Sequence, residues 1–237
     1  MENEQKARLE NIRRRFTEVG IEALSPNEAL ELALSYAFPR GDCYALSQTL
    51  LNKYGSLRNV FSSSLSQLQN ADGLGEAPAA FLTLISQIGR QIFLEDMERR
   101  PDAFAESADI GRYFLELVKG QRREALYELC LNGGNFLSCS SLTDGGALSE
   151  EMEARGELIR RTAEGALTSA ANAVVLCRRL SGGLLAPSVT DRVLIASVRA
   201  ALDTVRVDFR DYFLVTEDDF VSLSETGLLE RPWGIGE

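Results

Sequence analysis

The sequence contains no histidine, and this absence restricts its chemistry more than any other feature of the composition. Without an imidazole, the chain cannot build a histidine metal site or a Ser-His or Cys-His catalytic pair. Its four cysteines are widely separated and form no Cys-x-x-Cys motif. No run approaches the roughly 18 apolar residues that span a bilayer, and the polar N-terminus lacks the apolar core of a signal peptide. We therefore expect a cytoplasmic protein with reduced thiols and no membrane partner, and most common hydrolase mechanisms are excluded.

Basic side chains are also scarce relative to acidic ones. The 237 residues include 25 Lys and Arg against 35 Asp and Glu, which gives a net charge of −10. An acidic surface disfavours a general nucleic-acid binder, because such a protein needs positive charge along its contact surface. Hydrophobic residues make up 45% of the chain, which is typical of a folded protein and excludes an intrinsically disordered one.

The first 98 residues predict a run of short helices. Ser25-Pro26-Asn27-Glu28 combines an N-cap serine, a proline at the first helical position and a glutamate three residues after the cap, which together form a capping box. A longer helix is expected from about Pro78 to Glu98. We expect the buried side of that helix to carry its large apolar residues, namely Phe81, Leu82, Leu84, Ile85, Ile88, Ile92 and Phe93.

After a polar stretch at residues 98–102, predicted strands alternate with helices. The expected helices cover 109–119, 150–170 and 188–201, and the expected strands cover 125–131, 136–142, 173–177, 205–209, 212–216 and 220–223. The fold class is therefore α+β. We predict a helical domain at 1–98, a second domain at 105–230 and a C-terminal tail at 231–237 that contains Trp233.

The sequence between residues 132 and 135, Asn-Gly-Gly-Asn, predicts a two-residue hairpin turn. Counting outward from that turn pairs Cys130 with Leu137 and Glu128 with Cys139. The two thiols would then be diagonal neighbours on one face of the sheet, too far apart at ~7 Å for an unstrained disulfide. We interpret them as small hydrophobic residues.

The turn around Gly73-Leu74-Gly75 resembles the hairpin of a helix-hairpin-helix module. In such a turn, the glycines let a phosphate approach the backbone, and N–H groups at the following helix start can bind it. Here Asp72 and Glu76 flank the turn, and their negative charge would repel a phosphate. Gly73 and Gly75 are thus a candidate phosphate-binding turn, but a packing role is favoured and we expect no more than weak, salt-sensitive DNA binding.

The segment from Cys177 to Gly183, Cys-Arg-Arg-Leu-Ser-Gly-Gly, is followed by Pro-Ser-Val-Thr-Asp at residues 187–191. These motifs resemble the RadC-type branch of the JAB/MPN (JAMM) metalloprotease family, in which the stretch reads His-Asn-His-Pro-Ser-Gly and then Pro-Ser-x-x-Asp. Further matching segments lie along almost the whole chain, at residues 22–25, 54–57, 73–75, 123–124, 157–160 and 221–229. The resemblance implies a second domain with a mixed β-sheet flanked by helices, and a zinc-dependent peptidase or isopeptidase activity.

In the family, two histidines and an aspartate hold zinc, a serine helps to stabilise the tetrahedral intermediate, and a glutamate takes a proton from the zinc-bound water. The positions that match the zinc ligands here are Cys177, Arg179 and Asp191, while Glu124 and Ser188 match the catalytic glutamate and serine. Arginine offers no lone pair to a metal, and one thiolate with one carboxylate does not complete a tetrahedral zinc site. We therefore expect a degenerate site that holds no metal and no cofactor, with Glu124 and Ser188 as inactive remnants.

The favoured function is a non-catalytic JAB/MPN domain with a protein-interaction or scaffold role and an unidentified protein partner. The alternatives are the family's zinc-dependent peptidase, with zinc as its cofactor, and a DNA-repair-associated DNA-binding protein. We also predict that a guanidinium replaces the zinc, pairing with Asp191 and Glu124. The alignment assigns this role to Arg179, although one additional residue in the following loop would allow Arg178 to take it instead.

Overall fold

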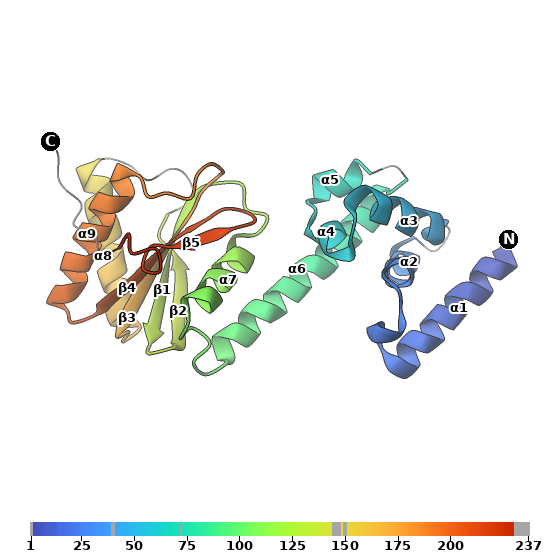
Figure 1. The fold of residues 1–237 in the computed structure, drawn as a ribbon, viewed down its shortest axis with the longest axis horizontal. Helices are drawn as coiled ribbons and strands as arrows, with labels where there is room; N and C mark the ends of the chain where they lie inside the picture. Colours follow the sequence, from blue (N-terminus) through green and yellow to red (C-terminus); the bar gives the residue numbers. More distant parts are fainter. Residues whose placement is uncertain (1, 39–40, 72, 144–147, 149–150, 230–237) are drawn as a thin grey trace. The chain divides into compact units, whose positions relative to one another are not determined.

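A computed structural model describes residues 2–38, 41–71, 73–143, 148 and 151–229 of the chain (Figure 1). The chain divides into two compact units, Met1–Gln91 and Ile92–Glu237. The tail that contains Trp233 lies outside the described residues. Within the described part, no helix combines the length and the apolar character needed to cross a membrane.

The first unit is built from helices (Figure 1). They are α1 (Glu2–Val19), a short 3-10 helix (Ile21–Ala23), α2 (Pro26–Ala37), α3 (Cys43–Tyr54), α4 (Leu57–Ser62), α5 (Leu65–Gln69) and most of α6 (Glu76–Arg99). The predicted start of α2 is confirmed. The Ser25 hydroxyl accepts a hydrogen bond from the Glu28 amide at 3.3 Å, and the Glu28 carboxylate accepts one from the Ser25 amide at 2.9 Å.

Helix α6 was predicted correctly in its extent but not in its buried face. It contributes Ala79 and Leu82 to the core of the first unit and Leu94 and Met97 to a core of the second. Four apolar side chains that we expected to be buried are instead 53%, 37%, 51% and 54% exposed, namely Leu84, Ile85, Ile88 and Ile92. The prediction was wrong because helical periodicity identifies an apolar stripe without identifying which stripe meets the rest of the protein.

The second unit is a five-stranded mixed sheet with helices on both faces (Figure 1). Its elements are α7 (Ser107–Val118), β1 (Ala125–Asn132), β2 (Asn135–Ser141), α8 (Met152–Thr168), β3 (Ala173–Arg179), α9 (Val189–Thr204), β4 (Asp208–Val215) and β5 (Phe220–Ser222). The strand order is β2-β1-β3-β4-β5, with β3 and β4 parallel and the other neighbouring pairs antiparallel. The predicted α+β class and mixed, helix-flanked sheet are confirmed.

Two apolar cores lie on opposite faces of this sheet. Helix α7 packs on one face, where Phe114 belongs to the same buried core as Val175 of β3 and Phe213 of β4. Helices α8 and α9 cover the other face, where Leu194 of α9 belongs to the same buried core as Leu176 of β3. Successive residues of β3 therefore alternate between the α7 face and the α8/α9 face, as strand geometry requires.

The end of the chain forms two strands where the sequence predicted three. Residues 208–215 form the single strand β4, and β5 follows at 220–222. Arg210 and Asp211, which lie between two of the predicted strands, are both part of β4, where the pairing with β3 shifts by one residue. A β-bulge of this kind places an additional residue in one strand without ending it.

A second bulge changes the predicted β1–β2 pairing. Asn132 pairs with Asn135 across the predicted two-residue turn, where Gly133 has a φ of +62°. Leu137 is then the additional residue, so Cys130 pairs with Ser138 rather than with Leu137. Because a one-residue shift reverses the faces of the side chains, Cys130 lies in the α8/α9 core, whereas Cys139 packs against the α7 core. The prediction that both thiols share one face was wrong.

Candidate functional site

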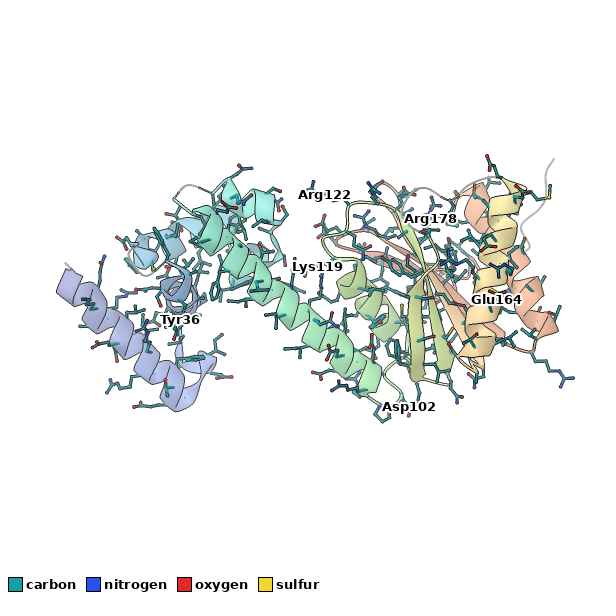
Figure 2. The ribbon with its side chains drawn as sticks, turned by 180° about the vertical axis from the view of Figure 1, so that it is seen from behind. Tyr36, Asp102, Lys119, Arg122, Glu164 and Arg178 are labelled. Carbon is teal, nitrogen blue, oxygen red and sulfur yellow. The ribbon has the colours of Figure 1, made fainter. Side chains whose placement is uncertain are left out.

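Five polar side chains from four segments meet near the C-terminal end of β3, on the α8/α9 face. They constitute what we call the Arg178 cluster: Glu124, Arg178, Ser188, Asp191 and Tyr212. The strand register explains the convergence, because Arg178 lies beside Leu126 at the start of β1 and Leu176 lies beside Tyr212 of β4. Alternation along β3 directs Arg178, which is labelled in Figure 2, to the same face as Leu176, and its guanidinium contacts Asp191 in the first turn of α9.

The start of α9 fixes the carboxylate of Asp191. Ser188 is the N-cap of this helix, and its hydroxyl accepts a hydrogen bond from the Asp191 amide at 3.2 Å. In return, Asp191 Oδ2 accepts hydrogen bonds from the Ser188 amide at 2.7 Å and from the Ser188 hydroxyl at 2.6 Å. This capping box holds a negative charge in the first turn of a helix, where the helix dipole stabilises it.

The guanidinium of Arg178 lies between two carboxylates. Its Nη1 donates to Oδ1 and Oδ2 of Asp191 at 2.9 and 2.7 Å, and its Nη2 donates to Oε2 of Glu124 at 3.1 Å. The Asp191 side chain is 1% exposed and that of Arg178 is 12% exposed, so this ion pair is largely shielded from water, whereas Glu124 is 22% exposed. Arg178 therefore joins the start of β1 to the start of α9 through β3.

Tyr212 and Ser181 complete the hydrogen bonding of the two carboxylates. The Tyr212 hydroxyl donates to Asp191 Oδ1 at 2.6 Å, and the Ser181 hydroxyl donates to Glu124 Oε1 at 3.3 Å. Sequence reasoning did not assign a role to either residue. The signal for Tyr212 lies in the resemblance to the RadC-type family, which aligns Asp211-Tyr212 with an Asp-His pair, here on the strand that runs parallel to β3.

Hydrogen bonding determines which groups of the cluster are charged. Burial alone would raise the pKa of Asp191, but hydrogen bonds from Ser188, Tyr212 and Arg178 outweigh it and hold that pKa below its ordinary value. Burial favours the neutral form of Arg178, yet its contacts with Asp191 and Glu124 raise its pKa above the usual value. Burial and the neighbouring Asp191 carboxylate raise the pKa of Tyr212, which keeps its hydroxyl protonated as a donor. Asp191 is thus a carboxylate held by cationic and neutral donors.

The two positions that match the family's histidines lie on the opposite face of the sheet. Cys177 is fully buried in the α7 core, where burial raises the pKa of its thiol well above the ordinary value. Arg179 donates a short hydrogen bond to the backbone carbonyl of Gln121, which follows α7. The expected pairing of Arg179 with Asp191 is therefore wrong, and Arg178 makes it. The physical reason is that β3 continues as a regular strand to Arg179, which sends Arg178 and Arg179 to different faces.

The donor set of the cluster does not fit a zinc ion. Both oxygens of Asp191 accept hydrogen bonds, and Cys177 and Arg179 face away from it. In the described part of the chain, no three or more His, Cys, Asp or Glu side chains are grouped so that they could hold a metal. A tetrahedral zinc site needs three or four such ligands converging on one point.

Asp211 has a structural position outside the Arg178 cluster. It is 1% exposed, and burial raises the pKa of its carboxyl group. Its Oδ2 accepts from the Ser222 hydroxyl at 2.5 Å, and its Oδ1 accepts from the amides of Tyr212 and Ser224 at 2.7 and 2.9 Å. Asp211 therefore connects β4 to β5 and to the turn that follows β5.

The candidate phosphate-binding turn lies in the first unit, directly before α6. Gly73 has a φ of +81°, a conformation that favours glycine, and the intervening Leu74 is buried in the helical core. Glu76 is the first residue of α6, while Asp72 lies outside the described residues. Phosphate binding by Gly73 and Gly75 stays a prediction.

Comparison with known proteins identifies relatives over most of the chain. The RadC-like JAB domain family matches residues 104–228, which contain the whole Arg178 cluster. A UPF0758 protein of Burkholderia thailandensis is 31% identical over 216 residues, covering 91% of this chain and 80% of its own length. A UPF0758 protein of Vibrio cholerae is 28% identical over 91% of this chain, and one of Fusobacterium nucleatum is 24% identical over 96% of it; these matches cover 94% and 99% of the relatives. The chain therefore belongs to the RadC-like JAB domain family.

Proposed function

We propose that the JAB domain of this chain is a non-catalytic member of its family and acts as a protein-interaction or scaffold module. The observation that carries this proposal is the bond of Arg178 to both Asp191 and Glu124. The resemblance to the JAMM proteases assigns zinc binding to the first carboxylate position and proton transfer to the second. Here one guanidinium forms ion pairs with the carboxylates at both positions, which supports a structural rather than a catalytic role for them.

We expect the ion pairs of the Arg178 cluster to stabilise the fold. A buried ion pair is strongly destabilised when one partner is removed, because the remaining charge is left without compensation. Both carboxylate oxygens of Glu124 accept hydrogen bonds within the cluster, Oε2 from Arg178 and Oε1 from Ser181. This arrangement supports a role in holding strand and helix together.

Apolar side chains flank the cluster in sequence and are open to solvent. Leu184, in the loop before α9, is 84% exposed, and Val189, the first residue of α9, is 76% exposed. Single exposed apolar residues are common, but these two lie on either side of Ser188, whose hydroxyl belongs to the cluster. We therefore propose that the protein partner binds at Leu184 and Val189, which we call the rim of the cluster.

Metal analysis tests the non-catalytic part of the proposal. We expect that protein purified without chelator, and then incubated with zinc and desalted, retains no stoichiometric zinc by elemental analysis. The matched control is Arg178→His, which places beside Asp191 an imidazole, a metal ligand that the wild-type chain lacks. About one zinc per wild-type chain that is lost in Cys177→Ala, or a peptidase activity that is lost in Glu124→Gln, would overturn the proposal.

The interaction part is tested by comparing in-cell cross-linking of the wild type with that of Leu184→Asp and Val189→Asp. We expect both variants to lose the same cross-linked protein partner, while Met152→Asp, on the exposed start of α8, keeps it. Cross-links that are identical in all four proteins would place the contact elsewhere and refute the rim assignment.

The DNA-binding alternative is tested separately. We expect only weak, salt-sensitive binding to duplex DNA, because the chain carries a net charge of −10 and Glu76 begins the helix after the Gly73-Gly75 turn. Sub-micromolar affinity at physiological salt, lost in Gly73→Ala or Gly75→Ala, would favour this alternative over the scaffold role.

A further inference from the structure

Arg179, the last residue of β3, is a buried cation that contacts no carboxylate among the residues that the structure describes. It is 4% exposed, and strand alternation places it on the α7 face, as it does Cys177 two residues earlier. Its Nη2 donates to the backbone carbonyl of Gln121, whereas Nε and Nη1 are shielded from solvent and have no hydrogen-bond partner. Most of the five N–H donors of this guanidinium are therefore unused.

The surroundings of Arg179 make this arrangement unfavourable. An arginine stays charged at every accessible pH, so it cannot relieve its burial by losing a proton. Its neighbours across the sheet are Ala125 of β1 and Val215 of β4, whose side chains offer no acceptor. Buried polar groups nearly always have a partner, and a buried charge is normally paired with an opposite one. The unused donors therefore point to an anion that completes the site.

Two other arginines of the same unit show how this fold satisfies a guanidinium. Arg178 uses Nη1 and Nη2 for carboxylates, and Arg210 uses both for the backbone carbonyls of residues 104, 105 and 133. Arg179 differs from both because its Nη1 is bound by nothing. The contrast lies wholly within the second unit, so it does not depend on where the first unit lies.

The turn between α7 and β1, residues 119–124, fixes Arg179 in place. Gln121 in this turn accepts from Arg179 through its carbonyl, accepts from the Tyr127 hydroxyl through Oε1 at 2.6 Å, and donates from Nε2 to the Leu117 carbonyl at 3.1 Å. The guanidinium is thus positioned before any ligand binds, which lowers the entropic cost of binding.

The same turn adds positive charge. Arg122 and Arg123 follow Gln121 directly, and neither forms an ion pair with the part of the chain that the structure describes. Arg123 lies two residues before Ala125, the residue that pairs with Arg179 in the sheet. In a chain with a net charge of −10, a buried arginine beside two unpaired ones is a local site of opposite sign. Such a site attracts anions by long-range electrostatics.

We propose that Arg179 binds a small oxyanion, a carboxylate or phosphate group, on the α7 side of the sheet beneath the turn at residues 119–124. Nε and Nη1 donate to the oxyanion, while Nη2 keeps its bond to Gln121. A guanidinium recognises both groups through the same charge-assisted hydrogen bonds. Because its donors are shielded from solvent, the turn has to move for the anion to enter. The site lies on the opposite face from the Arg178 cluster, so this inference is independent of the non-catalytic role proposed above.

Thermal unfolding of the full chain in different anions tests the proposal. At matched ionic strength, replacing chloride by phosphate or acetate should raise the midpoint of the wild type, and the rise should saturate, as binding to a folded-state site requires. Arg179→Met should be at least as stable as the wild type in chloride, because it removes an unpaired buried charge, and should lack the saturating rise. Any general stabilisation by phosphate is shared by all variants.

Two sets of variants sharpen the test. The matched control is Arg112→Met, which removes an arginine that pairs with Asp109 on the exposed side of α7 and should keep the full rise. Arg179→Lys keeps the charge without the guanidinium donors, so it should bind at least about tenfold more weakly than the wild type. Arg122→Gln and Arg123→Gln should each weaken binding by no more than about fivefold, as expected for surface charges.

Each outcome of these measurements decides the proposal. A saturating rise with phosphate alone would support a phosphate-bearing ligand, and one with acetate as well would support a carboxylate-bearing ligand. No saturating rise in the wild type, or the same rise in Arg179→Met, would overturn the proposal. A loss of stability in Arg179→Met that is equal in chloride, acetate and phosphate would also overturn it, because Arg179 would then serve only to hold Gln121.

Discussion

Two buried carboxyl groups on the α8/α9 face of the sheet have opposite electrostatic properties. Asp191 is 1% exposed and Glu128 is 2% exposed, so burial does not distinguish them. Asp191 accepts hydrogen bonds from Arg178, Ser188 and Tyr212, and its pKa is lowered. Glu128 has a buried oxygen, Oε1, without a hydrogen-bond partner, and burial raises its pKa to about 7. The comparison shows that donors supplied by neighbouring elements, rather than depth, decide whether a buried carboxyl group is charged.

The surroundings of Glu128 explain the difference. The group faces Ser140 on β2, Cys130 on its own strand and Arg161 on α8, all of which favour the charged form without offsetting burial. Arg161 directs its guanidinium to the backbone carbonyls of Leu142 and Ser141, so it does not form an ion pair with Glu128. Among the described residues, no arginine forms an ion pair with Glu128 as Arg178 does with Asp191.

The largest effect is expected from breaking the Arg178 cluster. Arg178→Met should lower the free energy of unfolding by about 3–5 kcal/mol, because it leaves Asp191 buried without a counter-ion. Adding Asp191→Asn should recover part of this loss, so the double variant should lose less than the sum of the single variants. Urea denaturation followed by circular dichroism measures all three.

The matched control for this cycle is Arg160→Met on α8. Arg160 also bridges two carboxylates, those of Glu157 and Glu164, but it does so in solvent. We expect no measurable change in stability from it. Small and additive losses of stability in Arg178→Met and Asp191→Asn would mean that the ion pair between Arg178 and Asp191 is exposed to solvent.

The next largest effect concerns the pH dependence contributed by Glu128. Its pKa is about 7 in the folded protein against 4.5 for the free side chain, so the folded state binds the proton more tightly. The stability from this group is present below pH 4.5 and is lost as the pH rises through 7, by an amount on the order of 3 kcal/mol. Glu128→Gln should remove this component, becoming more stable than the wild type above pH 7. Denaturation midpoints at several pH values test this, and parallel curves for the two proteins would contradict it.

The pH dependence of stability contributed by Asp191 should have the opposite sign to that contributed by Glu128. Its pKa is lowered in the folded protein, so its contribution to stability is present above the ordinary pKa of 3.8 and is lost as the pH falls below that value. Acid titration of unfolding should therefore show a loss in the wild type that is smaller in Asp191→Asn. Equal acid sensitivity of the two proteins would mean that the Asp191 carboxylate is not stabilised in the fold.

The smallest effect is expected at Gly165 of α8. A Cβ at this position would lie 2.2 Å from Oε2 of Glu128, so alanine would have to displace the carboxyl group. Gly165→Ala in the wild type should therefore not give the usual gain of about 0.5–1 kcal/mol for replacing glycine inside a helix. In the Glu128→Ala background the same substitution should give that gain. Thermal unfolding of the four proteins measures the difference.

The sequence was sufficient to predict features that depend on local interactions. The capping boxes at Ser25 and Ser188 lie within four residues, and the α2 box and the hairpin turn at Gly133 were predicted with their correct positions. The pairing of an arginine with Asp191 and Glu124 was also expected, because a buried carboxylate without its metal needs another cation.

Features that depend on contacts between distant segments were not predictable in the same way. The choice of Arg178 over Arg179 depends on how far β3 continues as a regular strand, and the role of Tyr212 depends on the pairing of β4 with β3. The bulge at Leu137 determines which face carries Cys139, and residue patterns alone do not specify it. The exposed side of α6 likewise depends on where the cores of both units lie.

The bulge at Leu137 has a consequence for aggregation. Strand β2 forms one edge of the sheet, and its sequence, Asn-Phe-Leu-Ser-Cys-Ser-Ser, contains no charged residue and no proline. Such an edge would ordinarily be a template on which strands of other molecules could add, as in amyloid. The additional residue kinks β2 and interrupts its regular row of backbone donors and acceptors. Leu137 thereby limits the length of edge that another chain can extend.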